Sequence, residues 1–577
     1  MGPPAIISRK APDGVDPDSA TASLVNGGIN PWLARALALR GEYAPNIALG
    51  GYDPLPVDGM KGMPEMVARL RAAIAHREPI FVVADYDADG AASAVVAVLG
   101  LRAMGAVVDF IVPNRFVHGY GLTPSVVDLV AERRPRPRVI VTVDNGIASN
   151  AGVAHANHLG FDVLVTDHHL AGAELPQAAA IVDPNQPGCM FPSKSIAGCG
   201  VILYVLTALR DSFRADGMPE GDVRLANLLD VVGVGTIADV VHLDRNNRWL
   251  VYRALTRIRA GRARPGIQAL FNASRRSAEH AASSDFGFSL GPRINAAGRL
   301  ADMTTGIRCL LTEDAALAGV LAEDLASLNE HRKEIESEMR DVALDAIDAG
   351  DSTRLTRVAF GEEFHEGVVG IVASRIKERD GAPTVVFAPS SSNAALLKGS
   401  ARGVPGMNLR DAIDRVHKLG MSPERPDGLC EKFGGHAMAA GLTIRRDRLP
   451  LFRELFERSV SEALGGALPS RSILVDGDLP NEAIEPNTAR GLSQAVWGTG
   501  FEEPVWHGEF DIVSTRLVGA DRNHLKMRVR RGDSEFEAIQ FFCNEEPPHG
   551  SCNIAYRLSW NVWNDRERAE LLVVDKR

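Results

Sequence analysis

Five short runs of apolar, mostly β-branched residues follow one another between residues 79 and 182. They are IFVVA (80–84), VVDFIV (107–112), VIVTV (139–143), VLVT (163–166) and AAIV (179–182). Runs of this kind, without a regular polar alternation, fit strands that are buried on both faces, as in parallel sheets. The segments between them, such as 91–104 and 148–159, are long enough for crossover helices. The alternation therefore predicts a doubly wound α/β domain.

A long charged segment, residues 312–350, follows a mostly helical region from 201 to 309. Its apolar residues recur at spacings of four and three, which is typical of a helix with one apolar seam. The seam consists of Leu321, Leu325, Leu328, Ile335, Met339 and Val342, and Arg332 interrupts it. One continuous helix would span about 58 Å and join two domains. Two shorter helices packed in a core would produce the same seam.

The rest of the chain predicts two further modules. Strands near 357–360, 384–388 and 441–444, with helices near 368–377 and 451–463, indicate a second, smaller α/β domain. From about residue 472, five or more strand-like segments within about 100 residues fit a small β-barrel. The predicted parts are a leader (1–57), a first domain with a helical extension (58–311), a connecting helix (312–350), a second domain (351–465) and a barrel domain (466–577). We expect the leader to be loosely packed, because it combines Pro, Gly and Asp clusters with one short helical stretch near 32–39.

Composition narrows the functional classes. The 577 residues carry 63 basic and 73 acidic side chains, a net charge of −10, so any phosphate-binding surface has to be a local patch. Six cysteines without a CxxC pair indicate neither a disulfide framework nor a zinc knuckle. The N-terminus lacks a signal-peptide core, and the most apolar stretch, 91–101, is far shorter than the ~20 residues that span a bilayer. We therefore expect a cytoplasmic protein without membrane attachment.

Acidic residues and histidines stand directly after three of the predicted strands. DYDADG supplies Asp85, Asp87 and Asp89, VDNG supplies Asp144, and TDHH supplies Asp167, His168 and His169. Because the carboxyl ends of parallel strands line one crevice, we expect these side chains to converge. Asp239 in GTIAD, after a further apolar run, is an additional candidate. A turn or a surface pair explains each motif alone, but not their repeated position at strand ends.

Carboxylate and imidazole ligands in this number suit Mg²⁺ or Mn²⁺, and the histidines favour Mn²⁺. Two such ions about 3.5–4 Å apart activate water and stabilise in-line displacement at phosphorus. A calcium loop is excluded, because its twelfth position would be Val96 instead of glutamate and because a strand precedes the motif. The pattern therefore predicts a two-metal hydrolase of phosphate esters.

The ordered motifs DYDADG, VDNGI, TDHH and GTIAD resemble the signatures of the DHH phosphoesterase superfamily. FSLGPRINAAGRL (288–300), HEGVVGIVASRI (365–376), LKGSARG (397–403) and FGGHAMAAGLTI (433–444) are similar to motifs of the RecJ family of single-strand-specific 5′ exonucleases. The resemblance implies a DHH domain and a DHHA1 domain joined by a long helix around a DNA-admitting cleft, followed by an OB-fold. It implies metal ligands at Asp87, Asp89, Asp144, His168 and Asp239, support or second-ion ligation by Asp85 and His169, an orienting role for Asp167, and a scissile-phosphate contact by His436.

The resemblance also implies a pocket for the terminal 5′-phosphate. Its residues would be Ser400, Arg402, Arg115, and Arg293 or Arg299 with Asn295 in the PRINAAGR motif. Arginine suits this task because its planar fork matches phosphate oxygens bidentately.

In the barrel, Lys526, Arg528 and Arg530 share one strand face and form a candidate phosphate-tracking row. Residues 471–577 nevertheless carry 13 basic and 18 acidic side chains, a net charge of −5. The aromatic residues Phe541, Phe542, Trp560 and Trp563 fit core packing better than base stacking.

The favoured function is a two-metal 5′-to-3′ exonuclease that releases mononucleotides from single-stranded DNA, in DNA repair, mismatch repair and recombination. The 5′ sense, the DNA preference and this setting come from the resemblance, as do a single-stranded-DNA-binding protein and a RecQ-type helicase as partners of a monomer. The alternative enzyme is a DHH phosphoesterase for short oligonucleotides or cyclic dinucleotides, which the linking helix and the barrel disfavour. A non-catalytic replication factor would be expected to lose ligands, but every motif carboxylate and both histidines are present.

Overall fold

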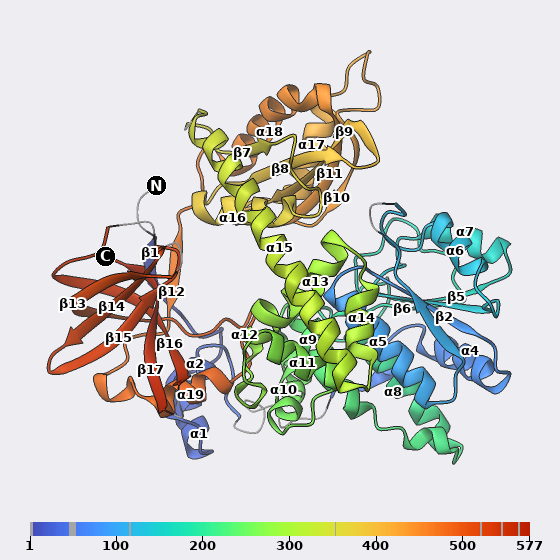
Figure 1. Ribbon diagram of the computed structural model, residues 1–577, viewed down its shortest axis with the longest axis horizontal. Coiled ribbons are helices and arrows are strands. Elements are labelled where there is room, and N and C mark those ends of the chain that lie inside the picture. Colours follow the sequence, from blue (N-terminus) through green and yellow to red (C-terminus); the bar gives the residue numbers. More distant parts are fainter. Residues whose placement is uncertain are drawn as a thin grey trace.

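The computed structural model describes residues 4–44, 54–114, 117–351, 353–519, 522–543, 546–563 and 566–577. Figure 1 shows three bodies: a large α/β domain with a helical layer, a smaller α/β domain above it, and a barrel at the other side of the molecule. One long helix, α15, rises from the helical layer into the smaller domain. The predicted fold class is therefore confirmed.

The first sheet contains five parallel strands in the order β3-β2-β4-β5-β6. They are β2 (Ile80–Ala84), β3 (Val108–Ile111), β4 (Val139–Val143), β5 (Asp162–Thr166) and β6 (Ala180–Val182). The first and third strands along the chain are thus neighbours, and this is the topological switch point where open α/β sheets bind ligands. Helix α5 (Ala88–Ala103) covers one face of the sheet, and α6 (Pro124–Ala131) and α7 (Asn150–His158) cover the other. All five predicted strands are present.

A helical layer extends the first domain, as predicted for residues 201–309. It includes α8 (Gly198–Ala215), α9 (Leu229–Ala238), α10 (Arg245–Arg259), α11 (Pro265–Ala273), α13 (Gly291–Leu300) and α14 (Thr304–Leu311). Helices α8 and α9 pack on α5, and their buried residues join one core with the sheet. This layer closes the side of the sheet on which α5 lies.

Helix α15 (Ala315–Asp348) is one continuous helix of 34 residues, about 51 Å long at 1.5 Å per residue. Asp314 caps its start, because its carboxylate accepts from the backbone N–H groups of Ala316 and Leu317. Arg332 interrupts the apolar seam without cost to continuity, since its guanidinium donates to Glu336 at 2.5 Å and to Asn329 at 2.9 Å. Of the two interpretations of the seam, the continuous helix is therefore correct.

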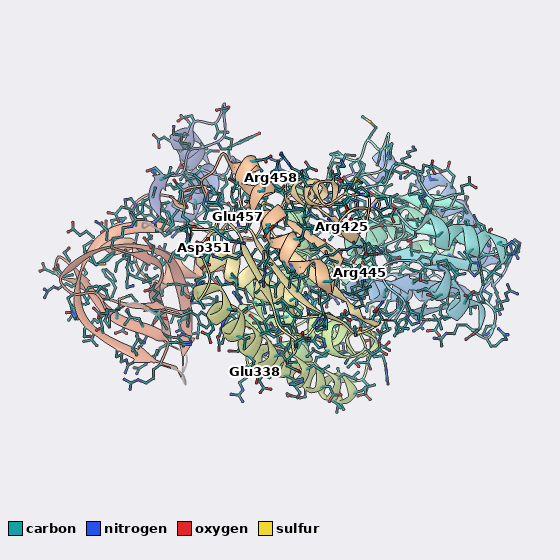
Figure 2. The ribbon with its side chains drawn as sticks, turned by 90° about the horizontal axis from the view of Figure 1, so that it is seen from above. Glu338, Asp351, Arg425, Arg445, Glu457 and Arg458 are labelled. Carbon is teal, nitrogen blue, oxygen red and sulfur yellow. The ribbon has the colours of Figure 1, made fainter. Side chains whose placement is uncertain are left out.

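The second domain has a five-stranded sheet in the order β10-β11-β9-β8-β7, in which only β7 and β8 are parallel. Its elements are β7 (Arg357–Phe360), α16 (Val369–Asp380), β8 (Thr384–Ser390), β9 (Asn393–Arg402), α17 (Leu409–Leu419), β10 (Cys430–Gly435), β11 (Ala439–Arg445) and α18 (Leu449–Leu464). Glu457 of α18 accepts from the backbone N–H groups of Leu355 and Thr356 at 2.8 and 3.0 Å, which ties α18 to the segment entering β7. Glu457 is labelled in Figure 2. The sequence pattern missed β9 and β10.

The C-terminal module is a closed barrel in the order β13-β14-β15-β17-β16, as predicted. Its strands are β13 (Trp506–Val518), β14 (His524–Arg531), β15 (Ser534–Gln540), β16 (Ser551–Trp563) and β17 (Arg566–Lys576). Trp506, Phe510 and Tyr556 are fully buried inside it. The strand β12 (Ser472–Val475) and helix α19 (Pro486–Gln494) connect it to the second domain.

The expectation of a loosely packed leader is wrong. Strand β1 (Ala5–Ser8) pairs in parallel with β12, and helices α1 (Pro17–Asn26) and α2 (Pro31–Ala38) bury apolar residues in the main core. Trp32 contacts Trp506 of the barrel edge-on, with ring centroids 6.2 Å apart. Arg40 pairs with buried Asp476 at 2.5 Å. The prediction failed because the partners of this segment lie more than 400 residues away in the sequence. A local pattern contains no information about such partners.

Among the described residues, no helix is long and apolar enough to cross a membrane.

Candidate active site

The loop after β2 turns directly into α5 and presents three carboxylates. Asp87 caps the helix, because its Oδ1 accepts from the N–H groups of Asp89 and Gly90 at 3.0 and 2.9 Å. Asp89, fully buried in the first turn, accepts from the N–H groups of Gly198 and Cys199 at 2.6 and 3.0 Å. The start of α8, which packs beside α5 on the same side of the sheet, therefore fixes the Asp89 carboxylate.

Asp144 follows β4 in a sharp turn. Its φ of +61° is in the left-handed region, which Asp tolerates better than most residues. The side chain of Asn145 secures the turn by donating to the carbonyls of Val83 and Val143 at 3.1 and 2.9 Å. Gly198 leaves room for Asp144, since a Cβ at that position would lie 2.8 Å from the Asp144 Cβ. The turn thereby holds a buried carboxylate at the switch point.

Asp167, after β5, organises the two histidines that follow it. Its carboxylate accepts from the N–H groups of Ile147 and His168 at 2.9 and 2.8 Å, and it lies 2.7 Å from Nδ1 of His169. Burial raises the pKa of Asp167, but the hydrogen bond and charge of His169 outweigh burial and lower the pKa below its ordinary value. Asp167 thus orients His169 and leaves the other ring nitrogen for a further partner.

The side chains from these loops converge on one point. His168 Nε2 lies 3.1 Å from Asp144 Oδ1 and 3.5 Å from Oδ2 of Asp239, the residue that directly follows α9. These three buried atoms have no hydrogen-bond partner among the described residues. Three groups each place one ligand atom per residue within 4.8 Å of the others: Asp144, His168 and His169; Asp89, His168 and Asp239; and Asp85, Asp87 and Asp144. Asp144 belongs to the first and third groups, and His168 belongs to the first and second. Overlapping groups of this kind can hold two neighbouring cations.

The electrostatics of the cluster also fit divalent cations. Burial and repulsion from neighbouring carboxylates raise the pKa values of Asp144 and Asp239 well above the ordinary range. Burial lowers the pKa of His168, which favours the neutral imidazole that binds metal. Buried carboxylates in this number are stabilised when a dication neutralises them.

Two residues beside the cluster were missed from the sequence. Asp183 follows β6 and is 1% exposed, and burial raises its pKa to about 7. Its carboxylate accepts from the N–H of Asn185, whose side chain in turn donates to the His168 carbonyl at 2.6 Å. Tyr120 has its hydroxyl 3.3 Å from Nε2 of His169. The strand-end position of Asp183 in AIVDPN was a usable signal, whereas HGYG carried none for Tyr120.

Helix α13 connects the cluster to the second domain. Asn295 Oδ1 accepts from the N–H of Ala88 at 2.8 Å, so this predicted substrate residue lies against the start of α5, next to the loop that carries Asp85 and Asp87. Arg299 donates to the Gly367 carbonyl of the second domain at 3.0 Å. Arg293 donates back to the Ser289 carbonyl at 2.7 Å. The three residues of this motif therefore contact three different segments: the start of α5, the second domain and the turn before α13.

Ser400 and Arg402 form a separate polar site on β9. The Arg402 guanidinium donates to Ser400 Oγ and Ser374 Oγ, both at 2.9 Å, and it has no carboxylate partner within the described ranges. Burial lowers its pKa. Gly370, in the first turn of α16, keeps the space open, since a Cβ there would lie 2.9 Å from Arg402 Nη2. A half-buried cation beside the start of a helix is suited to an anion such as phosphate.

The remaining predicted residues do not join the cluster. His436 is exposed on the hairpin between β10 and β11, and no contact of the described residues brings it to the acidic and histidine cluster. Arg115 lies outside the described residues. Lys526 pairs with Glu537 and Glu570 at 3.4 and 3.6 Å. A phosphate group could bind Lys526 only by displacing these carboxylates.

The other members of the basic row on the barrel are paired as well. Arg528 lies 3.5 Å from Glu537, and Arg530 lies 3.9 Å from Asp511. Of the four aromatic residues, Phe541 and Phe542 are 48% and 73% exposed instead of buried in the core. Trp560 packs on His280, whereas the side chain of Trp563 is outside the described part of the chain.

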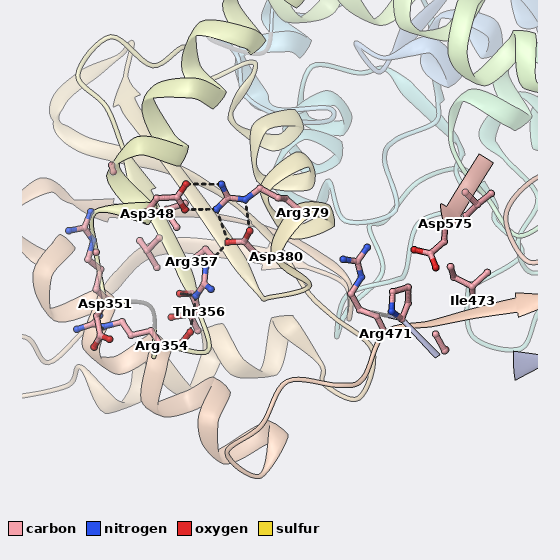
Figure 3. A pocket seen from close by; sticks show the side chains of 18 of the residues that line it. Asp348, Asp351, Arg354, Thr356, Arg357, Arg379, Asp380, Arg471, Ile473 and Asp575 are labelled. Carbon is pink, nitrogen blue, oxygen red and sulfur yellow. Dashed lines mark hydrogen bonds and ion pairs between the residues drawn. The ribbon is translucent and has the colours of Figure 1, made fainter. Parts of the chain in front are cut away.

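A cavity of about 1150 Å³ lies elsewhere, between the end of α15, the edge strand β7 and the barrel (Figure 3). Its arginines are largely paired with acids, as Figure 3 shows for Arg379 with Asp348 and Asp380. None of the cluster residues lines it. The chemistry of the molecule therefore belongs to the strand ends and not to this cavity.

Comparison with known proteins connects this geometry to one family. The sequence matches the DHH family N-terminal domain over residues 79–236, the DHHA1 domain over 354–462 and the RecJ OB domain over 475–575. It is 42% identical over 560 residues to the single-stranded-DNA-specific exonuclease RecJ of Escherichia coli, covering 94% of this chain and 95% of the relative. The RecJ of Haemophilus influenzae is 41% identical, covering 89% and 90%. The crystal structure of RecJ in complex with Mn²⁺ from Thermus thermophilus superposes with a TM-score of 0.80 at 28% identity, covering 99% of this chain and 79% of that one. The Mg²⁺ complex gives 0.73 at 26%, covering 99% and 78%.

Proposed function

The chain belongs to the RecJ family, and on this premise we propose that it is a single-stranded-DNA-specific exonuclease that removes mononucleotides from the 5′ end with two divalent cations. The observation that carries the proposal is the meeting of Asp144, His168 and Asp239 through buried atoms that lack hydrogen-bond partners among the described residues. Metal ions satisfy such atoms. The related structures that contain Mn²⁺ and Mg²⁺ support these two ions as the cofactors.

The ligands of the two ions would be Asp85, Asp87, Asp89, Asp144, His168, His169 and Asp239. When bound, the ions lower the pKa of a water molecule, neutralise phosphate oxygens and stabilise the in-line transition state. The chain contributes the rigidity of this arrangement. The start of α8 holds Asp89, Asn145 holds the Asp144 turn, and Asp167 holds the ring of His169. Because Asp89, Asp144 and His169 are fixed before substrate arrives, these side chains need little reorganisation during the reaction.

Ser400 and Arg402 would bind the terminal 5′-phosphate. Arg402 is free of carboxylates in the described part of the chain and is already oriented by two hydroxyls, so an anion can take the remaining positions around its guanidinium. Arg115, Arg293 and Arg299 would contribute further contacts to the strand, and His436 would contact the scissile phosphate from the second domain. An end pocket at a fixed distance from the metal ions would select cleavage from that end.

The proposed setting is DNA repair, mismatch repair and recombination in the cytoplasm, with a monomer acting beside a single-stranded-DNA-binding protein and a RecQ-type helicase. On the barrel, Lys526 and Arg528 would contact the strand only by exchanging their carboxylate partners for phosphates. The family membership supports this setting, and the barrel matches the OB domain of that family.

The test is digestion of single-stranded and duplex DNA with Mn²⁺, labelled at either end, by the wild type and Asp144→Ala. We expect immediate release of 5′-labelled mononucleotides from single strands and complete loss in the variant. The control is Asp324→Ala, an exposed carboxylate on α15, which should retain full activity. Fast cleavage of dinucleotides with slow cleavage of long strands would assign the chain to the small-substrate phosphoesterases instead. Absence of metal-dependent cleavage would overturn the proposal.

A further inference from the structure

A single π-helical turn, Phe286–Leu290, immediately precedes α13. Phe286 and Leu290 are fully buried, whereas Phe288 between them is 83% exposed. No other large apolar side chain in the described ranges is as exposed. Single π-turns inside helices occur frequently at functional sites. The phenyl ring of Phe288 is therefore accessible to a ligand.

The π-turn lies against the helix end that carries a metal ligand. A Cβ on Gly287 would lie 3.3 Å from Ile237, and a Cβ on Gly291 would lie 3.0 Å from Ala238. These are the last two residues of α9, and the next residue is Asp239, 3.5 Å from His168. The π-turn that carries Phe288 therefore packs against the end of α9, directly before Asp239.

A second exposed apolar residue accompanies it. Val240 follows Asp239, is 66% exposed and has a φ of +61°, which is unfavourable for a β-branched residue. Backbone strain of this kind persists where the surrounding structure imposes it, and it concentrates at ligand sites. Two exposed apolar side chains, those of Val240 and Phe288, thus belong to the segments next to Asp239.

The same turn also orients a cation. Arg293 donates to the carbonyl of Ser289, and no carboxylate in the described part of the chain pairs with it. Its Nε is buried without a hydrogen-bond partner among the described residues. A phosphate oxygen would satisfy this nitrogen. A nucleotide of a single strand offers one aromatic base and one phosphate, the two groups that Phe288 and Arg293 are suited to bind.

We propose that Phe288 stacks on one base of the bound strand, next to a phosphate held by Arg293. The inference rests on the proposed exonuclease function and adds a specificity residue to it. An unpaired base offers a free face to the ring, whereas a base inside a duplex is already stacked on both sides. The contact therefore favours single strands without reading their sequence.

The first test compares Phe288→Ala, Phe288→Leu and Phe288→Trp on a 5′-phosphorylated oligonucleotide. We expect KM to rise about tenfold in the alanine variant with kcat nearly unchanged, and Trp to restore the wild-type KM. Leu, which keeps apolar area without a π-face, should restore it only in part. The matched control is Tyr43→Ala, which removes a 55% exposed aromatic side chain from the N-terminal segment. An unchanged KM in Phe288→Ala would overturn the inference.

The second test locates the partner base. Oligonucleotides with one abasic site at successive positions from the 5′ end are digested by the wild type and by Phe288→Ala. At one position the missing base should raise the wild-type KM about tenfold but leave the variant unaffected, because the two changes remove the same contact. Penalties that multiply at every position would show that Phe288 does not stack on a base. If the wild type digests no strand at all, the proposed function itself fails, which is a different outcome from the failure of this contact.

Discussion

Gly298 in α13 offers a sharp test of how the loop between β2 and α5, which carries Asp85 and Asp87, is held. An added Cβ would lie 1.8 Å from the carbonyl oxygen of Tyr86, a residue between Asp85 and Asp87. Since Cβ contacts below 3.0 Å essentially do not occur, Gly298→Ala has to separate the two segments by at least 3.0 − 1.8 = 1.2 Å. Displacements near 1 Å at a catalytic centre cost about 10²-fold in rate.

We therefore expect kcat of Gly298→Ala on single-stranded DNA to fall about 10²-fold. Overpacking of this kind costs about 1–3 kcal/mol of folding free energy, so the variant remains folded and a thermal melt checks that it does. Gly319→Ala is the control, because that glycine lies in α15 with nothing within 4 Å of an added Cβ, and Ala stabilises helices by about 0.5–1 kcal/mol over Gly. A Gly298→Ala enzyme that keeps kcat within threefold of the wild type would refute the argument that α13 positions the loop.

Three further predictions concern the metal ions, the anion site and pH. Chelation with EDTA should abolish digestion and lower the melting temperature. Burial and mutual repulsion raise the pKa values of Asp144 and Asp239, and bound cations compensate their charge. A melting temperature that Mn²⁺ does not change would contradict this prediction. Ser400→Ala and Arg402→Gln should each raise KM about tenfold for a 5′-phosphorylated strand but leave a 5′-hydroxyl strand nearly unaffected, and equal losses on both strands would argue against an end pocket. Burial raises the pKa of Asp183 to about 7, above its unfolded value near 4, so the folded state binds the extra proton and wild-type stability falls as pH rises from about 4 to about 7. Melts of the apoprotein should show Asp183→Asn gaining stability relative to the wild type over this interval and no further above it. A stability difference that does not change with pH would disprove the assignment.

Much of the first domain was predictable because its information is local. All five strand runs became strands of the first sheet, and the acids after β2, β4 and β5 lie at the strand ends as expected. The strands β9 and β10 were missed because NAALLKGSAR and CEKFGG contain few β-branched residues, and their strand geometry comes from pairing with β8 and β11. The motif identified Ser400 and Arg402 as candidate site residues, although the sequence pattern did not predict β9, the strand that carries them.

The residue roles depended more strongly on tertiary structure. Asn295 was predicted to bind substrate, and the structure adds a contact that the motif does not show, since its amide oxygen accepts from the N–H of Ala88. The Lys526 row was predicted from strand alternation, which is present, but cross-strand glutamates accompany it. Phe288 belongs to a quoted motif, although nothing in the letters distinguishes an exposed phenyl ring from a buried one. For Asn295 and the Lys526 row the missing fact was the identity of a neighbour that is distant in sequence, and for Phe288 it was the exposure of the side chain.

The sequence alone thus determined the class of the fold, the order of its parts and the identity of the candidate metal ligands. These follow from residue periodicity and from chemistry placed at strand ends, both of which act over a few neighbouring residues. Only the tertiary structure decided that Asp239 meets His168, that the N-terminal segment packs on the barrel, and that α13 holds the start of α5. Such contacts join residues separated by 70 to more than 400 positions. Their formation depends on the packing of whole elements, because close-packed surfaces select one arrangement among many that the same local patterns allow.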